Sequence, residues 1–226
     1  VQEERFTRKK HDPSLPKHAI QYCLEEGNIE ADDLEAVVYY DNPFLTAGRF
    51  VQNLRYTGSD SKDLLDFSLE SLTSRKMWIH EMLREYMGRL GIDNKLYVAE
   101  HHISHAASAF FPSPYQEAAI ITVDGVGEYV TTTIGYGRDN HIQILEEIEY
   151  PHSLGLLYSA FTYFCGFKVN SGDYKLMGLA PYGKPKYCQL IKDHLIDIKP
   201  DGSYRLNLAY FDFQYGRTMT NERFAQ

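Results

Sequence analysis

The sequence has little cysteine. Its three cysteines, Cys23, Cys165 and Cys188, lie far apart, and no two of them form a Cys-x-x-Cys pair. An odd number of widely spaced cysteines is not the pattern of a small disulfide-bonded scaffold. We therefore expect a protein of a reducing compartment and assign it to the cytoplasm.

Membrane and secretion signals are also missing. No apolar run approaches the roughly 20 residues that a membrane-spanning helix needs, and the start "VQEERFTRKKHD" is too charged for a signal peptide. Positive charge is outnumbered as well: 23 Lys and Arg stand against 31 Asp and Glu, which gives a formal net charge of −8. A negatively charged protein does not favour nonspecific binding to nucleic acid. We expect neither a membrane nor a nucleic acid as a partner, and leave the oligomeric state open.

What the sequence does contain is a globular pattern. Apolar residues make up 43% of 226 residues, enough for a core. The hydrophobic periodicity predicts a mixed α/β protein with an antiparallel set of strands beside helices. The predicted elements are a helix over 14–29, a buried strand over 34–40, one or two helices over 63–90, a strand over 95–100, strands over 118–124, 129–137 and 141–150, a helix over 153–167 with Ser153 as its N-cap, a short helix within 171–185 and a weakly strand-like tail.

Three of the nine histidines lie within five positions of the stretch "AEHHISHAASAFFPSPY", residues 99–115. On a helix, His101 and His105 project from one face, and two nitrogens at this spacing can bind one divalent ion. His102 points elsewhere. A histidine cluster can equally be an acid/base group or a solvated pair, so this spacing alone does not decide. The nearest further ligand is Asp124, at the end of a predicted strand.

Glycine-rich segments offer candidate phosphate sites. In "VDGVGEYVTTT", Gly125 and Gly127 would let backbone N–H groups approach a phosphate beside a carboxylate, although Asp-Gly is also an ordinary hairpin turn. "NSGDYKLMGLAPYG" combines glycines with Asp173 and Lys175, and a capped helix explains it equally well. The basic run "RFTRKKH" is either solvated or a phosphate site.

The order of these segments carries a resemblance. "EERFTRKKHD", "HHISHAASAFFPSPY", "ITVDGVGEYVTTTIGYG", "SLGLLYSAFTYFCGF" and "GDYKLMGLAPYGKP" together resemble the carbamoyltransferase family of nodulation-factor and antibiotic biosynthesis. This region of the family resembles the tRNA threonylcarbamoyladenosine synthase subunit. The resemblance implies an actin/Hsp70/sugar-kinase-like (ASKHA) lobe with a mixed sheet and flanking helices, in which a nucleotide binds between two lobes.

The resemblance also implies a chemistry. Such enzymes transfer a carbamoyl group from carbamoyl phosphate to a hydroxyl of a sugar or natural product, using ATP and passing through a carbamoyl adenylate. The transfer takes place around a divalent metal, commonly Fe²⁺, with Mn²⁺ and Zn²⁺ as alternatives. A noncatalytic nucleotide- or metal-binding module of this fold, or threonylcarbamoyl transfer to a nucleoside, are the alternatives.

Individual residues follow from the same resemblance. His101, His105 and Asp124 are the implied metal ligands. Lys10, Arg49 and His102 are catalytic candidates, the first two for contacting phosphate or the carbamoyl group. The nucleotide-side candidates are Gly125, Gly127, Asp173 and Lys175.

The family pattern is incomplete here. Residues 1–226 begin with Val1 rather than Met and match the N-terminal part of the transfer domain. The family's first strand, second lobe, C-terminal YrdC-like domain and last aspartate ligand have no counterpart in this stretch. We therefore expect a piece of a longer enzyme, inactive by itself.

Overall fold

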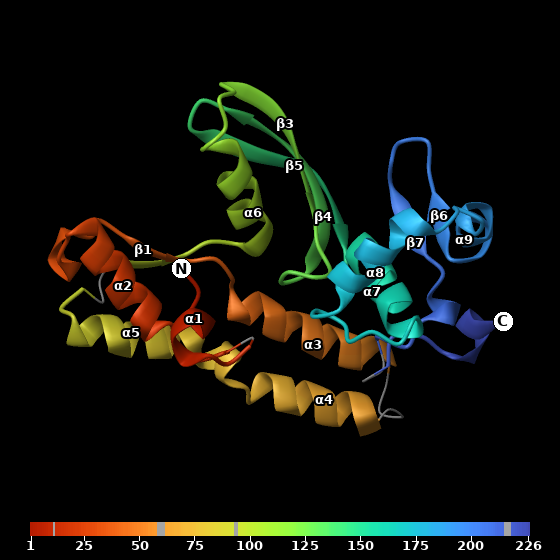
Figure 1. Ribbon diagram of the computed structural model, residues 1–226, viewed down its shortest axis with the longest axis horizontal. Coiled ribbons are helices and arrows are strands. Elements are labelled where there is room, and N and C mark those ends of the chain that lie inside the picture. Colours follow the sequence, from red (N-terminus) through yellow and green to blue (C-terminus); the bar gives the residue numbers. More distant parts are fainter. Residues whose placement is uncertain (11, 58–61, 93–94, 215–217) are drawn as a thin grey trace.

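The computed structural model describes residues 1–10, 12–57, 62–92, 95–214 and 218–226. Three groups of elements follow one another along the chain (Figure 1). Helices on a small parallel sheet come first, then a twisted three-stranded sheet with α6, and then a second group of helices with a short hairpin.

The first group packs helices against two short strands. β1 and β2 pair in parallel, and one face of the pair lies on a core that includes Leu83, Met87 and Ile92. Its elements are α1 (Glu4–Thr7), α2 (Lys17–Gly27), η1 (Ala31–Asp33), β1 (Val37–Tyr39), α3 (Pro43–Thr57), α4 (Lys62–Leu72), η2 (Arg75–Trp78), α5 (Ile79–Arg89) and β2 (Leu96–Val98). The other face is open, since Val38 is 62% exposed.

A buried carboxylate begins α2. Pro16, the N-cap residue, has no side-chain oxygen that could accept the first backbone N–H groups. Glu3, the residue before α1, takes this role. Its carboxylate accepts hydrogen bonds from the backbone N–H groups of His18 and Ala19. This contact docks the N-terminal segment onto α2.

The central sheet is an antiparallel meander in the order β3-β4-β5. Its strands are β3 (Glu117–Val123), β4 (Val130–Arg138) and β5 (His141–Glu149). Asp139 occupies the tight turn between β4 and β5 with φ of 53°, a left-handed conformation that Asp tolerates. Strand alternation therefore predicted this part of the fold correctly.

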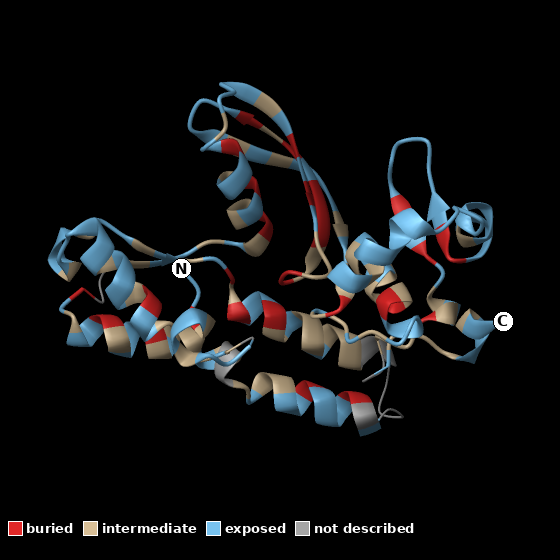
Figure 2. Cartoon of the chain, viewed as in Figure 1, coloured by how far each residue is buried: buried red, intermediate tan, exposed pale blue. Residues whose placement is uncertain are grey.

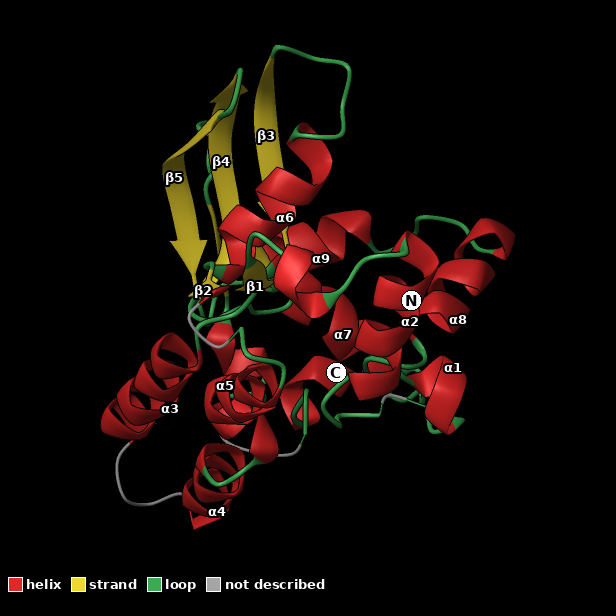
Figure 3. Cartoon of the chain, turned by 90° about the vertical axis from the view of Figure 1, so that its left-hand side faces the viewer, coloured by secondary structure: helices red, strands yellow, loops and turns green. Residues whose placement is uncertain are grey.

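Helix α6 (His101–Phe110) covers one face of the meander (Figures 1 and 3). Ala106 and Phe110 pack on Ile120 of β3. The fit is close at Gly137, where a Cβ would lie 2.7 Å from the Phe110 ring. The contact fixes the helix, and with it His101 and His105, relative to the strands.

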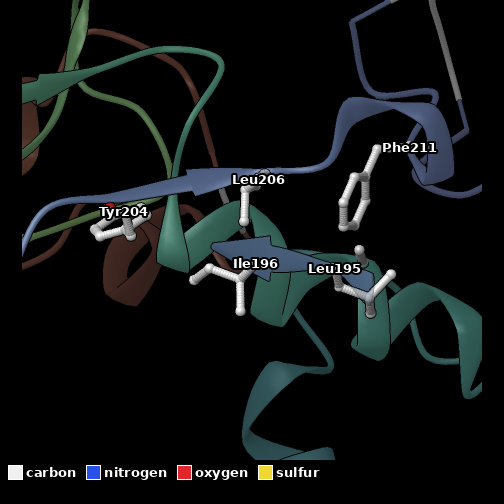
Figure 4. Packing of buried hydrophobic residues seen from close by; sticks show 6 residues of the cluster. Leu195, Ile196, Tyr204, Leu206 and Phe211 are labelled. Carbon is white, nitrogen blue, oxygen red and sulfur yellow. The ribbon is translucent and has the colours of Figure 1, made fainter. Parts of the chain in front are cut away.

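The last group encloses its own core. Figure 4 shows Leu195, Ile196, Tyr204, Leu206 and Phe211 packed together, and Ala160 of α7 completes the buried cluster. The elements are α7 (Leu154–Phe164), α8 (Asp173–Leu179), η4 (Ala180–Tyr182), α9 (Cys188–His194), β6 (Ile196–Ile198), β7 (Tyr204–Leu206), η5 (Leu208–Tyr210) and η6 (Glu222–Ala225). Ser153 caps α7 as predicted, because its Oγ accepts from Leu156 N–H.

Two predictions about the strands need correction. The described residues do not form one mixed sheet: they form a parallel pair, the three-stranded meander and the antiparallel pair β6–β7. The strand expected over 34–40 is shorter and only half-covered, because helices pack on one of its faces. The broader expectation of a mixed α/β protein is confirmed.

Burial follows these packing faces. Buried residues lie along β4, on the sheet side of α6 and within α7 (Figure 2). Ile121 and Val123 on β3 are 68% and 52% exposed on the face away from α6. In the part of the chain that the structure describes, no helix has the length and apolar character needed to cross a membrane.

Candidate metal centre

The first turn of α6 presents the two predicted histidine ligands side by side. β2 leads directly into this helix, where Glu100 is the N-cap and His101 the first helical residue. His105 follows one turn later on the same face. The helix predicted from "HHISHAASAF" is confirmed.

Asp124 completes the cluster from the β3–β4 connection. Its Oδ2 lies 2.7 Å from His101 Nε2 and 3.5 Å from His105 Nε2. The two Nε2 atoms are 3.0 Å apart. The structure therefore brings together the three residues predicted as metal ligands. One ligand atom from each of these three described residues lies within 4.8 Å of the other two, which is close enough for all three to hold one ion.

The spacing fits a single ion. Ligand atoms about 2.1 Å from a common ion lie roughly 3.0 Å apart in octahedral and about 3.4 Å apart in tetrahedral coordination. The three observed separations, 2.7, 3.0 and 3.5 Å, fall around these values. Two imidazoles and a carboxylate are donors shared by Fe²⁺, Mn²⁺ and Zn²⁺, so the donor set leaves the metal's identity open.

The cluster is also electrostatically suited to a cation. The hydrogen bond to Asp124 raises the pKa of His101. The same hydrogen bond is the main cause that lowers the pKa of Asp124, to which the backbone N–H of Gly125 adds. An imidazole must lose its proton before it binds a metal ion. The carboxylate that attracts a proton to His101 would equally attract a metal ion that takes the proton's place.

His102 faces the interior instead of the cluster. Its Nε2 lies 2.8 Å from the carbonyl oxygen of Val130, which can only accept, so this nitrogen donates. Nδ1 then accepts from the Thr122 hydroxyl at 2.6 Å, and Thr122 accepts from Thr133 at 2.6 Å. Burial lowers the pKa of His102 and so favours its neutral form. These contacts favour a positioning role for His102 over the predicted catalytic one.

The loop from Asp124 to Glu128 lies directly on His101. A Cβ on Gly127 would come within 2.6 Å of His101 Cδ2, whereas one on Gly125 would meet open space. Arg49 Nη1 donates to the carbonyl oxygens of Gly127 and Glu128 at 2.9 and 2.8 Å. Gly127 is thus needed to admit the His101 ring, and Arg49 uses one guanidinium nitrogen to hold the loop.

Helix α7 and its N-cap residue also contact this loop, which sequence reasoning missed. Ser153 Oγ lies 3.0 and 2.6 Å from the carbonyl oxygens of Asp124 and Gly125. Gly155 is packed against the same backbone, because a Cβ there would lie 2.5 Å from Asp124 O. A glycine within a helix lowers the helix's stability, so Gly155 in the first turn of α7 was the one sign in the sequence that another backbone comes close there.

The remaining candidates lie apart from these contacts. Lys10 is exposed in the turn after α1. Asp173 begins α8, and its backbone carbonyl accepts from the Tyr158 hydroxyl at 3.2 Å. Lys175 lies on the same helix and is exposed. Their proposed contacts with phosphate, the carbamoyl group or nucleotide stay predictions.

Comparison with known proteins places the chain in a family. Residues 1–226 match the family model described as "Carbamoyltransferase N-terminus". Relatives include the uncharacterized protein sll1178 of Synechocystis, 50% identical over all of this chain and 37% of the relative. The nodulation protein NolNO of Sinorhizobium fredii is 31% identical over 92% of this chain and 29% of the relative.

A further relative matches a smaller part. The nodulation protein NolO of Bradyrhizobium diazoefficiens is 32% identical over 48% of this chain. The chain thus spans about a third of the length of sll1178 and of NolNO. Its match to the family model, by contrast, covers every residue. The chain belongs to the carbamoyltransferase family, whose N-terminal region it represents.

Proposed function

We propose that this chain forms the metal-binding part of an O-carbamoyltransferase. The enzyme would move a carbamoyl group, supplied by carbamoyl phosphate and activated by ATP as carbamoyl adenylate, to a hydroxyl of a small molecule such as a sugar or natural product. The observation that carries the proposal is the convergence of His101, His105 and Asp124 on one point. The ASKHA lobe arrangement and the nucleotide between lobes belong to the same proposal.

The transfer has a simple balance. The acceptor oxygen forms a bond to the carbamoyl carbon, the bond from that carbon to the phosphate oxygen breaks, and AMP leaves with the electron pair while the hydroxyl releases its proton. A divalent ion at this site would supply Lewis acidity, polarising the carbonyl or favouring the ionised hydroxyl. Asp124 and the two histidines would hold the ion, and His102, Arg49 and Ser153 fix the elements on which these residues lie.

The names of two relatives are consistent with such an acceptor. NolNO and NolO are named as nodulation proteins. The net charge of −8 gives no support to an RNA acceptor, since RNA binding normally uses a basic surface. A small-molecule acceptor is therefore the proposal, and its identity depends on surfaces beyond this cluster.

Metal content is the first test. The protein is purified without an affinity tag under reducing, iron-supplemented conditions, beside a His101→Ala, His105→Ala double variant. A His141→Ala variant, which removes an exposed histidine of β5, is the matched control. We expect about one metal per chain in the wild type and the control, and none in the double variant. Equal metal content in all three proteins would contradict the proposal.

The donor is tested on the complete enzyme. We expect AMP release that depends on carbamoyl phosphate and ATP, and that the double variant loses. Dependence on threonine and bicarbonate would indicate threonylcarbamoyl transfer instead. A protein without stoichiometric metal and without either activity would fit a noncatalytic module.

A further inference from the structure

The helix that carries both histidine ligands lacks a cap of its own. Glu100 is the N-cap residue of α6, but its side chain makes no capping hydrogen bond, and the first turn contains no acidic residue. The first backbone N–H groups of a helix have no partner within the helix and carry its positive dipole end. An anionic group from elsewhere in the fold would therefore stabilise this end of α6.

Glu128 supplies that group from the β3–β4 connection. Its side chain is buried, with the residue 6% exposed. The backbone N–H of Asn42 donates to its Oε1, and the backbone N–H of His101 also favours its ionised form. Burial is the largest influence and raises the pKa of Glu128, with a further contribution from the nearby Asp41 and Glu100 carboxylates. The carboxylate thus lies in a desolvated place, where it accepts from the backbone N–H of Asn42 and lies near the backbone N–H of His101.

The position of Glu128 links the two halves of the metal centre. It lies four residues after Asp124, in the loop that Arg49 holds through the carbonyl oxygens of Gly127 and Glu128. Gly127 of the same loop contacts the His101 ring closely enough to exclude a Cβ. The loop therefore lies against the His101 ring through Gly127, and it brings the Glu128 carboxylate near the His101 backbone N–H.

We propose that Glu128 is a positioning residue that sets the separation between His101 and Asp124 by binding the N-terminus of α6 from the loop that carries Asp124. The inference rests on the metal site of the proposed function, and Glu128 itself is not a ligand in it. Partners that orient metal ligands typically change metal affinity by about 10- to 100-fold when they are removed. Replacing Glu128 is therefore expected to weaken metal binding even in a variant that keeps the fold.

The test uses Glu128→Gln and the metal-free protein titrated with Co²⁺. An amide in this place removes the negative charge and replaces one of the two acceptor oxygens by an NH₂ donor, so it satisfies backbone N–H groups less well. We expect binding about 10- to 100-fold weaker than in the wild type, and a changed visible absorption spectrum of bound Co²⁺, which reports coordination geometry. Glu117→Gln, which removes an exposed carboxylate paired with Arg138 on the same sheet, should bind like the wild type.

Glu128→Asp provides the second variant. It keeps the charge but shortens the side chain, so we expect an intermediate loss of affinity with a wild-type far-ultraviolet circular dichroism spectrum. If Glu128→Gln does not fold, this variant decides the question. Wild-type affinity and spectrum in the folded variants, whether or not their melting temperature falls, would overturn the positioning role.

The failure of the inference is separable from that of the proposed function. A wild-type protein that binds Co²⁺ no better than the His101→Ala, His105→Ala double variant would overturn the metal site, and Glu128's role with it. A wild-type protein that binds Co²⁺ through these histidines, beside an unaffected Glu128→Gln variant, would overturn the role of Glu128 alone.

Discussion

Replacing Gly155 by alanine tests whether α7 holds Asp124 in place. The added Cβ would lie 2.5 Å from Asp124 O and from Gly125 N, while ordinary contacts begin at 3.4 Å, so the two backbones must separate by about 0.9 Å. Both neighbours are backbone atoms and cannot rotate away. Overpacking of this kind typically costs about 1–3 kcal/mol of folding free energy.

Two measurements follow from this displacement. Thermal unfolding should shift down by about 2–4 °C for each kcal/mol lost, the range for chains of this size. Because the peptide that moves carries Asp124, the proposed metal ligand, we also expect Co²⁺ affinity to fall by about tenfold or more. The matched control is Gly178→Ala in α8, where a Cβ meets nothing within 4 Å and helix propensity improves.

The combination of the two results decides the reasoning. A Gly155→Ala protein with wild-type melting temperature and wild-type Co²⁺ affinity would refute the close packing of α7 on the loop. A loss of stability with unchanged affinity would show that the loop yields without moving the carboxylate, and that α7 does not position it.

Three other substitutions test the contacts behind the cluster. Arg49→Met should destabilise the protein by about 1–3 kcal/mol in chemical denaturation, because two loop carbonyls lose their charged donor; an unchanged midpoint would argue against this support. Thr133→Val removes the hydroxyl that donates to Thr122, so we expect the free energy of unfolding to fall by about 1–3 kcal/mol as well. An unchanged unfolding curve would contradict this expectation. Tyr204→Phe removes the buried contact with Thr132, so a lower melting temperature is expected, and a higher one would contradict it.

The cluster of His101, His105 and Asp124 could be predicted because its signals are local. His101 and His105 are related by helical periodicity, and Asp124 ends a strand whose alternation is clear in the sequence. The residues that hold these ligands could not be predicted in the same way. Glu128 lies near the backbone N–H of His101, 27 positions earlier, and only the packing of α6 on the meander brings the two together.

Helix α3 shows the same limit in the fold. Its sequence, "PFLTAGRFVQNLRYT", has a glycine and several polar residues within it, and its apolar positions were not recognised as a helical face. Arg49 nevertheless reaches the β3–β4 loop only because this helix exists. The role predicted for Arg49, a contact for phosphate or the carbamoyl group, came from the family resemblance, which gives no information on its partners within this chain.

The closeness of α6 and the meander along the chain has a consequence for folding. α6 packs on β3, β4 and β5, all within residues 101–149, and Asp124 follows His101 by only 23 residues. Closing loops of this length costs little conformational entropy, and contacts of low sequence separation form rapidly. A bound ion would therefore stabilise a local cooperative unit of the chain, raising the free energy needed to open this segment above that of its surroundings.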